Sequence, residues 1–257
     1  MSAPLPPAET ASTLDVNGRA IAVRARAGTA PGVLWLGGFR SDMTGTKAQH
    51  LADWAAARGT SYARFDYSGH GVSGGRFEEG TISRWAEEAL AVFDQATAGP
   101  QIVVGSSMGG WIALLIARAL AARGETRLHG LVLIAPAPDF TEALMWAGFP
   151  EDVRRQIISE GRYERPSAYS VEPYVITRDL IEDGRRNLVL GAPFKVGCPV
   201  RILQGAQDED VPWAHAMRLV SCLAEDDVVF SLIKDGDHRL SRPEDLERLT
   251  VALEELL

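Results

Sequence analysis

One short stretch constrains the fold of this chain more than any other, a Gly-x-Ser-x-Gly sequence formed by Gly105, Ser107 and Gly109. An apolar run typical of a strand, 101–104, leads into it, and an Ala-, Leu- and Ile-rich run typical of a helix, 111–122, follows it. A strand that becomes a helix within about one residue forces the central serine into a strained conformation, and flanking glycines make room for that reversal. The arrangement predicts a nucleophile elbow with Ser107 as the nucleophile. Without the flanking strand and helix, the same residues would indicate only a glycine-rich turn.

Composition and charge exclude several classes of protein. The chain has 257 residues, 46% hydrophobic and 23% charged, which predicts one domain with a sizeable core. The net charge of −8 argues against nucleic acid or an anionic membrane surface as the main partner. The sequence leaves the oligomeric state open.

The two cysteines, Cys198 and Cys222, make no disulfide framework and lack the spacing of a zinc site. We therefore expect a reducing compartment, no metal and no cofactor. No window approaches the ~20 apolar residues of a membrane span. Residues 1–10 have the features of neither a secretory signal nor a transit peptide, so a cytoplasmic location is expected.

Strands and helices alternate along most of the chain. Asn17-Gly18 lies between the alternating runs 12–16 and 19–26 and predicts an antiparallel hairpin. The further expected strands are 31–36, 61–65, 101–104, 128–134, 198–203 and 227–233, and the expected helices are 45–58, 82–96, 111–122, 212–223 and one from Pro243. This order predicts an α/β fold, with a mostly parallel sheet flanked by helices and right-handed crossovers.

The alternation breaks between residues 139 and 193, where we expect helical fragments and turns but no strand. The segment is rich in large side chains: Met145, Trp146, Phe149, Tyr163, Tyr169 and Tyr174. We interpret it as a helical cap inserted into a single domain, 1–257, above the sheet edge where ligands bind in such folds. Met145 and Trp146 are candidate substrate-binding residues, although each could equally belong to the cap's own small core.

A serine hydroxyl needs a base within hydrogen-bonding distance, and that base needs a group to orient it. Among five histidines, His238 is the candidate base because it follows the last strand and precedes the last helix. The other four receive non-catalytic interpretations: His50 and His129 as structural, and His215 as solvated or a capping partner. His70 lies in a glycine-rich loop that could approach the site, but we favour a role in loop packing.

The acid should lie between the serine and the histidine in sequence. Asp208, in a turn just after strand 198–203, is the candidate acid, with Asp210 as the alternative. Asp210 precedes Val211-Pro212 and would more naturally cap the next helix.

An oxyanion formed during acyl transfer needs backbone N–H donors. We expect one from Met108 at the helix N-terminus and one from Phe39, in the loop Gly37–Arg40 after strand 31–36. Phe39 is also a candidate substrate-binding residue. The alternative interpretation of this loop is an ordinary turn between a strand and a helix.

Several runs carry a resemblance to a known family, namely 44–48, 64–69, 105–111, 208–213 and 237–239. On these runs the chain resembles the α/β-hydrolase-fold serine hydrolases over nearly its whole length. It is most similar to the abhydrolase acyl-protein thioesterases (depalmitoylases), which also act as acyl-glucuronide esterases. The resemblance implies nucleophile, acid and base roles for Ser107, Asp208 and His238, the same residues that the chemistry selects.

The expected function is hydrolysis of carboxylic esters or thioesters, on small molecules or acyl proteins, through an acyl-enzyme. A C–C bond hydrolase or a small-molecule lipase would use the same triad. From a different class, the fold can serve as a non-catalytic ligand receptor or scaffold. A haloalkane dehalogenase is disfavoured because it would need an aspartate at position 107.

Overall fold

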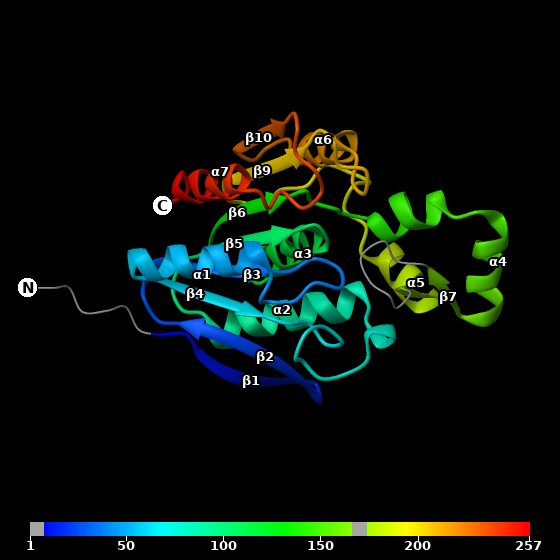
Figure 1. Ribbon diagram of the computed structural model, residues 1–257, viewed down its shortest axis with the longest axis horizontal. Helices are drawn as coiled ribbons and strands as arrows, with labels where there is room; N and C mark the ends of the chain where they lie inside the picture. Colours follow the sequence, from blue (N-terminus) through cyan, green and yellow to red (C-terminus); the bar gives the residue numbers. More distant parts are fainter. Residues whose placement is uncertain (1–7, 166–173) are drawn as a thin grey trace, which may run out of the picture.

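An eight-stranded sheet forms the centre of the computed structural model, which describes residues 8–165 and 174–257 (Figure 1). Its strands are β1 (Thr10–Val16), β2 (Arg19–Arg26), β3 (Thr29–Leu36), β4 (Thr60–Phe65), β5 (Gln101–Ser106), β6 (Leu128–Ile134), β9 (Val200–Gly205) and β10 (Val228–Ile233). They lie in the order β1-β2-β4-β3-β5-β6-β9-β10. Strand β2 pairs antiparallel with β1 and with β4, and the other pairs of this sheet are parallel. The predicted mostly parallel sheet is confirmed.

The chain opens with the predicted hairpin. Strands β1 and β2 pair in register from Thr10↔Ala25 to Val16↔Arg19. Asn17 and Gly18 both have positive φ, 54° and 79°, which is the conformation that a two-residue hairpin turn of this kind requires.

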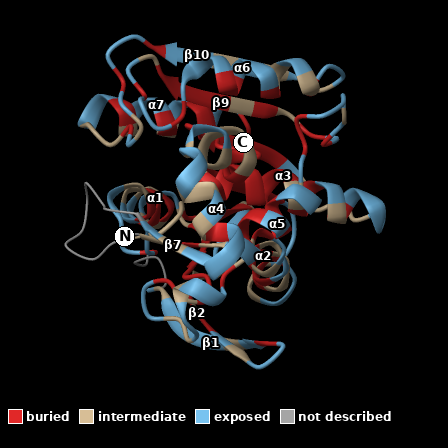
Figure 2. Cartoon of the chain, turned by 90° about the vertical axis from the view of Figure 1, so that its right-hand side faces the viewer, coloured by how far each residue is buried: buried red, intermediate tan, exposed pale blue. Residues whose placement is uncertain are grey.

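Helices cover both faces of the sheet, and Figure 2 shows the buried residues gathered in the strands and on the helix faces that meet them. The helices are α1 (Thr46–Arg58), α2 (Ile82–Ala96), α3 (Met108–Ala122), α6 (Trp213–Cys222) and α7 (Pro243–Glu254), with a short 3₁₀ turn, η1 (Phe77–Glu79). Side chains of α1 and α7 pack on one face of the sheet, and those of α2, α3 and α6 pack on the other. The helices that the sequence predicts are therefore present, within a few residues at their ends.

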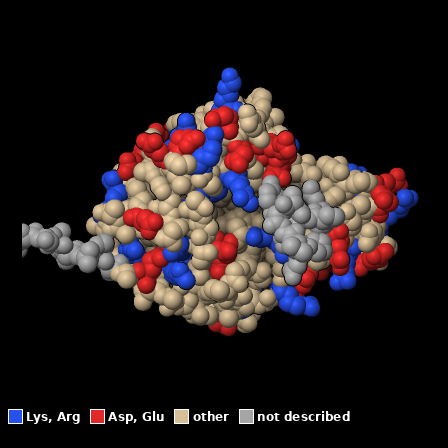
Figure 3. Space-filling model, viewed as in Figure 1, with Lys and Arg blue, Asp and Glu red and all other residues tan. Residues whose placement is uncertain are grey.

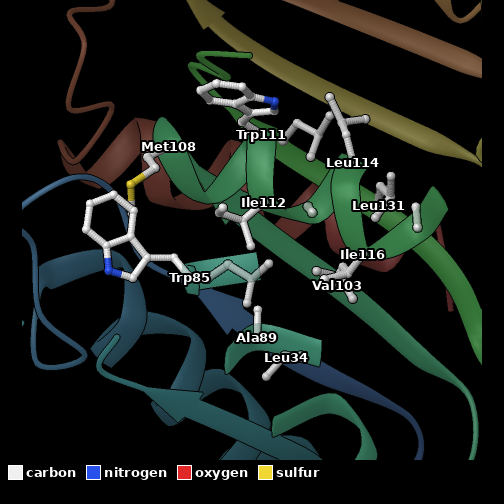
Figure 4. Packing of buried hydrophobic residues seen from close by; sticks show 14 of the residues in the cluster. Leu34, Trp85, Ala89, Val103, Met108, Trp111, Ile112, Leu114, Ile116 and Leu131 are labelled. Carbon is white, nitrogen blue, oxygen red and sulfur yellow. The ribbon is translucent and has the colours of Figure 1, made fainter. Parts of the chain in front are cut away.

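Helix α3 lies largely in the interior because Arg118 is its only charged residue and most of its other side chains are apolar. Ile112 and Ile116 are buried on the side of α3 that faces Trp85 of α2 and Val103 of β5, whereas Trp111 and Leu114 are buried on its opposite side (Figure 4). Burying one such side chain stabilises the fold by about 1.5–3 kcal/mol. Ser107 directly precedes this helix, so the packing of α3 holds the serine in place.

Between β6 and β9 the chain forms a second layer of structure beyond the sheet edge, on the right in Figure 1. Its elements are the π-helix η2 (Thr141–Trp146), α4 (Glu151–Glu160), β7 (Arg162–Arg165), β8 (Tyr174–Thr177) and α5 (Arg178–Arg186). The expectation that this stretch holds no strand is wrong, because β7 and β8 pair antiparallel. Ile157, Ile176 and Ile181 form a small separate core. The interpretation of 139–193 as a cap within one domain stays a prediction, and Tyr169 lies outside the described residues.

Two buried polar residues bond the backbone at the two ends of this segment. Asp139, at φ 58°, accepts hydrogen bonds from the backbone N–H groups of Val189 (2.8 Å) and Leu190 (2.9 Å), so it joins the two ends of the segment. Burial raises the pKa of the Asp139 carboxyl. His215 of α6 is buried and bonds the Pro138 carbonyl oxygen through Nε2 at 2.6 Å. The expectation of a solvated or helix-capping His215 is therefore wrong.

Charges of both signs are interspersed over the face shown in Figure 3. Within residues 8–165 and 174–257, no helix has both the length and the apolar character needed to span a bilayer.

Candidate active site

Ser107 occupies a strained backbone conformation between β5 and α3, with φ 53° and ψ −116°. A Cβ on Gly105 would lie 2.4 Å from the Gly109 carbonyl oxygen, and one on Gly109 would lie 2.1 Å from the Leu36 carbonyl oxygen. No side chain fits at such distances, so both positions require glycine. The local geometry is that of a sharp strand-to-helix turn that presents the serine side chain.

Three residues predicted from the sequence lie together at the carboxyl edge of the sheet. His238, in the loop between β10 and α7, places Nε2 3.1 Å from Ser107 Oγ. Its Nδ1 lies 2.8 Å from Oδ2 of Asp208, in the loop after β9. Both distances are within hydrogen-bonding range, so the His238 imidazole can act as a general base that takes the proton from the Ser107 hydroxyl.

The Asp208 carboxylate is held by several donors. Its side chain is fully buried, and Oδ1 accepts from the N–H groups of Asp210 (3.0 Å) and Val211 (2.7 Å). Gln204 Nε2 donates to Oδ2 at 3.1 Å. A carboxylate bonded in this way accepts a hydrogen bond from Nδ1–H of His238, which keeps the proton on Nδ1 and leaves Nε2 as the acceptor facing Ser107.

Asp210, the alternative acid, lies beside this group without taking the position of Asp208. Helix α6 begins at Trp213 with Pro212 as its N-cap and no side-chain hydrogen bond, so the expectation that Asp210 caps this helix is wrong. Among the described residues, Asp208, Asp210 and His238 could offer three metal-ligating atoms within 4.8 Å of one another. Asp208 and His238, however, already bond each other through Oδ2 and Nδ1, and proton transfer from the serine needs that hydrogen bond.

The predicted oxyanion donors border the serine. A Cβ on Gly38 would lie 3.4 Å from Ser107 Cβ, so the loop after β3 runs directly against the serine. Within the described part of the chain, the Phe39 N–H donates to no protein acceptor. Met108 is the first residue of α3, where a backbone N–H has no partner within the helix. Both N–H groups are thus available to a ligand, and their role stays a prediction.

The Phe39 side chain belongs to an aromatic cluster that links the sheet domain to the segment above it. Its ring meets Phe77, Phe140 and Trp85 edge to face, with centroids 4.9, 5.6 and 5.9 Å apart. The next side chain, Arg40, stacks its guanidinium on Phe77 and on Tyr174 of β8, 4.9 Å from each ring centroid. The loop is therefore restrained on both sides.

The two other predicted substrate-binding residues have different surroundings. Met145 lines a hollow of about 280 Å³. The other residues around that hollow are Leu144, Gly148, Phe149, Pro150, Val153 and Tyr163. Trp146 is not among the residues around that hollow. Its ring instead makes cation–π contacts with the guanidinium groups of Arg185 and Arg154, whose carbon atoms lie 4.7 and 5.7 Å from the ring centroid. A larger hollow of about 760 Å³ lies between β10 and α7 and contains none of the site residues.

Two supporting residues, Lys47 and Gln204, escaped the reasoning from sequence. Lys47 of α1 donates through Nζ to the Arg239 carbonyl oxygen and to Ser241 Oγ, directly after His238, and burial lowers the pKa of its amine to about 8. Gln204 is buried at the end of β9, where a polar residue closing an apolar strand was the available signal. His70, expected to pack in its loop, also bonds the Arg40 backbone. His50 bonds Thr250, and His129 is exposed.

Solved structures with the same fold define the class of this protein. A solved structure from Agrobacterium vitis S4 is 50% identical, with a TM-score of 0.91 over 96% of this chain and 98% of that one. The mouse alpha/beta hydrolase domain-containing protein 10 is 32% identical, with a TM-score of 0.85 and the same coverage of both chains. The predicted α/β-hydrolase fold is confirmed.

The sequence comparisons narrow the class to a family. A family model described as serine aminopeptidase, S33 (Hydrolase_4), matches residues 36–179. Mouse palmitoyl-protein thioesterase ABHD10, mitochondrial, is 35% identical over 231 residues, which cover 90% of this chain and 76% of the mouse protein. The chain therefore belongs to the Hydrolase_4 family of α/β hydrolases, and the predicted resemblance to the abhydrolase thioesterases is confirmed.

Proposed function

We propose that this hydrolase is a serine esterase or thioesterase that cleaves carboxylic esters or thioesters through an acyl-enzyme at Ser107. One observation carries the proposal, the hydrogen-bonded series from Ser107 Oγ to His238 Nε2 (3.1 Å) and from His238 Nδ1 to Asp208 Oδ2 (2.8 Å). The similarity to a palmitoyl-protein thioesterase supports the choice of ester or thioester substrates.

In the first half of the reaction, Ser107 Oγ attacks the substrate carbonyl carbon while His238 Nε2 takes the hydroxyl proton. The carbonyl π electrons move to the oxygen, and the N–H groups of Phe39 and Met108 donate to that oxyanion. Asp208 stabilises the imidazolium through Nδ1. The intermediate collapses when the bond to the leaving oxygen or sulfur breaks and Nε2–H protonates that atom.

In the second half, water attacks the acyl-Ser107 ester as His238 Nε2 takes one of its protons. The new oxyanion occupies the same pair of N–H groups. When it collapses, Ser107 Oγ leaves and receives the proton back from Nε2, so the acid is released and the serine is regenerated.

The proposed substrate carries an acyl chain, and its leaving group is a small molecule or a protein. Most side chains around the hollow lined by Met145 are apolar, although polar atoms also form a substantial part of its surface, and we propose it as a site for part of the acyl chain. Phe39 packs against both the core and the small cluster of the cap segment, so we place it beside the scissile group. The position of Trp146 between two arginines makes it the weakest of the three candidates.

A substrate panel on the wild type and on Ser107→Ala tests the proposal. We expect turnover of acyl esters and acyl thioesters of graded chain length, with slower cleavage of the matched amide and none by the variant. Retained turnover in Ser107→Ala would refute the mechanism. Equal turnover at every chain length would remove the thioesterase assignment, and turnover confined to C–C bond substrates would favour that alternative.

A fluorophosphonate probe separates an enzyme from a receptor of the same fold. We expect labelling of the wild type on Ser107. A wild-type protein that binds acyl ligands but is neither labelled nor able to turn over any ester would support the receptor alternative instead.

We also propose a cytoplasmic location. Cys198 and Cys222 are both free cysteines, and Cys198 is buried, which fits a reducing compartment. Fractionation of the source cells, followed by detection of the full-length protein, tests this proposal, and recovery in a membrane or organelle fraction would contradict it.

A further inference from the structure

A buried histidine from a distant loop holds the backbone beside the proposed oxyanion hole. His70 lies in the glycine-rich loop after β4, and its Nε2 is 3.1 Å from the Arg40 backbone nitrogen. Arg40 itself has a positive φ of 56°, which a non-glycine residue adopts only under restraint. The N–H that precedes it along the chain belongs to Phe39, the proposed oxyanion donor.

The hydrogen-bond partners determine which tautomer His70 adopts. Its Nδ1 lies 3.2 Å from the Ser68 carbonyl oxygen, and a carbonyl oxygen can only accept. Nδ1 therefore carries the proton, and Nε2 offers the lone pair that receives the Arg40 N–H. A second proton on the ring would remove that acceptor and set two donors against each other.

The surroundings of His70 favour the neutral form of its ring and pack it on several sides. The residue is 4% exposed, and its ring contacts Tyr67, Phe77 and Trp85 edge to face at 5.7, 5.2 and 5.2 Å. Trp85 Nε1 donates to the same Ser68 oxygen at 3.2 Å, which fixes the acceptor. Burial, aided by the nearby Arg40 cation, lowers the pKa of the imidazole to about 4.

We propose that His70 is a positioning residue for the reaction, because it fixes the Phe39 N–H toward the oxyanion through its hydrogen bond to the next amide. The inference rests on the proposed function. It goes beyond that proposal by assigning a role in transition-state stabilisation to a residue that contacts neither the substrate nor the three proposed catalytic side chains. Gly38 lies against Ser107, so a shift of this loop changes the distance from the Phe39 N–H to the developing charge.

Two substitutions separate the hydrogen bond from the packing. His70→Phe keeps an aromatic ring among Tyr67, Phe77 and Trp85 but has no acceptor for the Arg40 N–H. His70→Gln loses the ring but carries an amide oxygen at about the reach of Nε2. His129→Phe is the control, because His129 is an exposed histidine at the amino end of β6, whereas the site lies at the carboxyl ends of the strands.

The experiment measures kcat and KM for an activated acyl ester, and the melting temperature, in the full-length variants. Loss of an oxyanion donor lowers kcat by about 10²–10³-fold, and a displaced donor should cost less, so we expect roughly a 10- to 100-fold fall in kcat for His70→Phe with little change in KM. His70→Gln should recover most of the loss, and His129→Phe should resemble the wild type. Wild-type kcat in His70→Phe, or equal losses in His70→Phe and His70→Gln, would overturn the inference.

A second measurement tests the contact between His70 and the loop independently of any catalytic activity. Amide hydrogen exchange in the peptide that contains residues 37–41 should accelerate in His70→Phe, and it should stay close to wild type in His70→Gln. If the wild type cleaves no ester and yet exchange follows this pattern, the proposed function fails while the His70 link to the loop stands. Unchanged exchange in His70→Phe would remove the link itself.

Discussion

Ser107 keeps its strained backbone because its neighbours leave room for it. A residue in this region of φ/ψ space costs of the order of 1–3 kcal/mol, which the surrounding packing must offset. Gly105 and Gly109 contribute by having no Cβ where carbonyl oxygens approach to 2.4 and 2.1 Å. The buried helix α3 contributes by fixing the chain directly after the serine.

Gly105→Ala should destabilise the fold and displace the serine. Its new Cβ would meet the Gly109 carbonyl, a backbone atom that cannot rotate away, so we expect a loss of about 1–3 kcal/mol or more in the free energy of unfolding. Urea denaturation measures this loss. Gly191→Ala is the control, since nothing lies within 4 Å of its Cβ position, and it should change stability by less than about 0.5 kcal/mol. Equal stabilities of the two variants would contradict the account of the turn.

Asp208 and Asp210 can be told apart by removing one charge at a time. Asp208→Asn loses the acceptor that orients the His238 ring, so we expect kcat to fall by on the order of 10³–10⁴-fold. Asp210→Asn should keep most of the activity, because Asp208 is the residue whose carboxylate accepts the hydrogen bond from His238 Nδ1. Steady-state measurement of kcat for both variants with the same ester tests this assignment. A larger loss from Asp210→Asn would assign the acid role to that residue.

Reasoning from residues located Ser107, Asp208 and His238 because each follows a predicted strand at one edge of a parallel sheet, and such edges gather loops from distant parts of the chain. The partners of Lys47 and His70 could not be found in this way. Lys47 bonds Arg239, which is 192 residues away, and His70 bonds Arg40 across a turn of unpredictable shape. Such contacts depend on how loops pack, and no local pattern in the sequence records them.

Among the secondary-structure elements, α1 has a role beyond covering the sheet, because it supports the loop that carries His238. Lys47 lies in its first turn and donates to Arg239 and Ser241 in the loop after β10. Helix α1 also contacts α7, which follows that loop. The helix and the histidine loop therefore behave as one packed unit.

Lys47→Met should lower activity without a comparable loss of fold. Methionine keeps the apolar length of the side chain and removes the donor, so we expect kcat to fall by roughly 10-fold as the His238 loop loosens. Lys195→Met is the control, since Lys195 is exposed and pairs only with Glu225 at 3.7 Å in the described structure. Kinetics with melting temperatures tests this, and unchanged kcat in Lys47→Met would contradict the proposed support.

The elements of the sheet could be predicted from sequence, whereas those of the cap segment could not. Long apolar runs such as 128–134 can only be buried, which makes a central strand the natural outcome. Strands β7 and β8 have four residues each, and Arg162–Arg165 is largely charged. A pair this short is stabilised by contacts with α4 and η1 rather than by its own pattern.

The free energy of unfolding of the whole molecule should depend on pH in a way that reflects the burial of His70. Burial lowers the pKa of His70 to about 4, whereas the unfolded chain titrates near its ordinary value of about 6.5. The unfolded state therefore binds more protons in this window, and the wild type loses stability as pH falls from about 6.5 toward 4, by about 2 kcal/mol at pH ~5.

His70→Phe lacks this group, so its unfolding free energy should fall less than that of the wild type between about pH 7.5 and 5. Urea denaturation across that range measures both curves. Asp66, Asp139 and His215 also have shifted pKa values, but they are present in both proteins and cancel in the difference. Parallel curves would contradict the burial of a neutral His70.

At the scale of the whole molecule, one edge of the sheet gathers the ends of β3, β5, β9 and β10, and with them Phe39, Ser107, Asp208 and His238. The central claim is that this arrangement forms an acyl-enzyme on Ser107. Rapid quenching of the full-length protein with an activated acyl ester, followed by intact-mass and peptide mass spectrometry, tests it most directly. The account predicts a transient mass increase of one acyl group, located on Ser107 and absent from Ser107→Ala. Turnover without a detectable adduct on Ser107, persisting in Ser107→Ala, would contradict it.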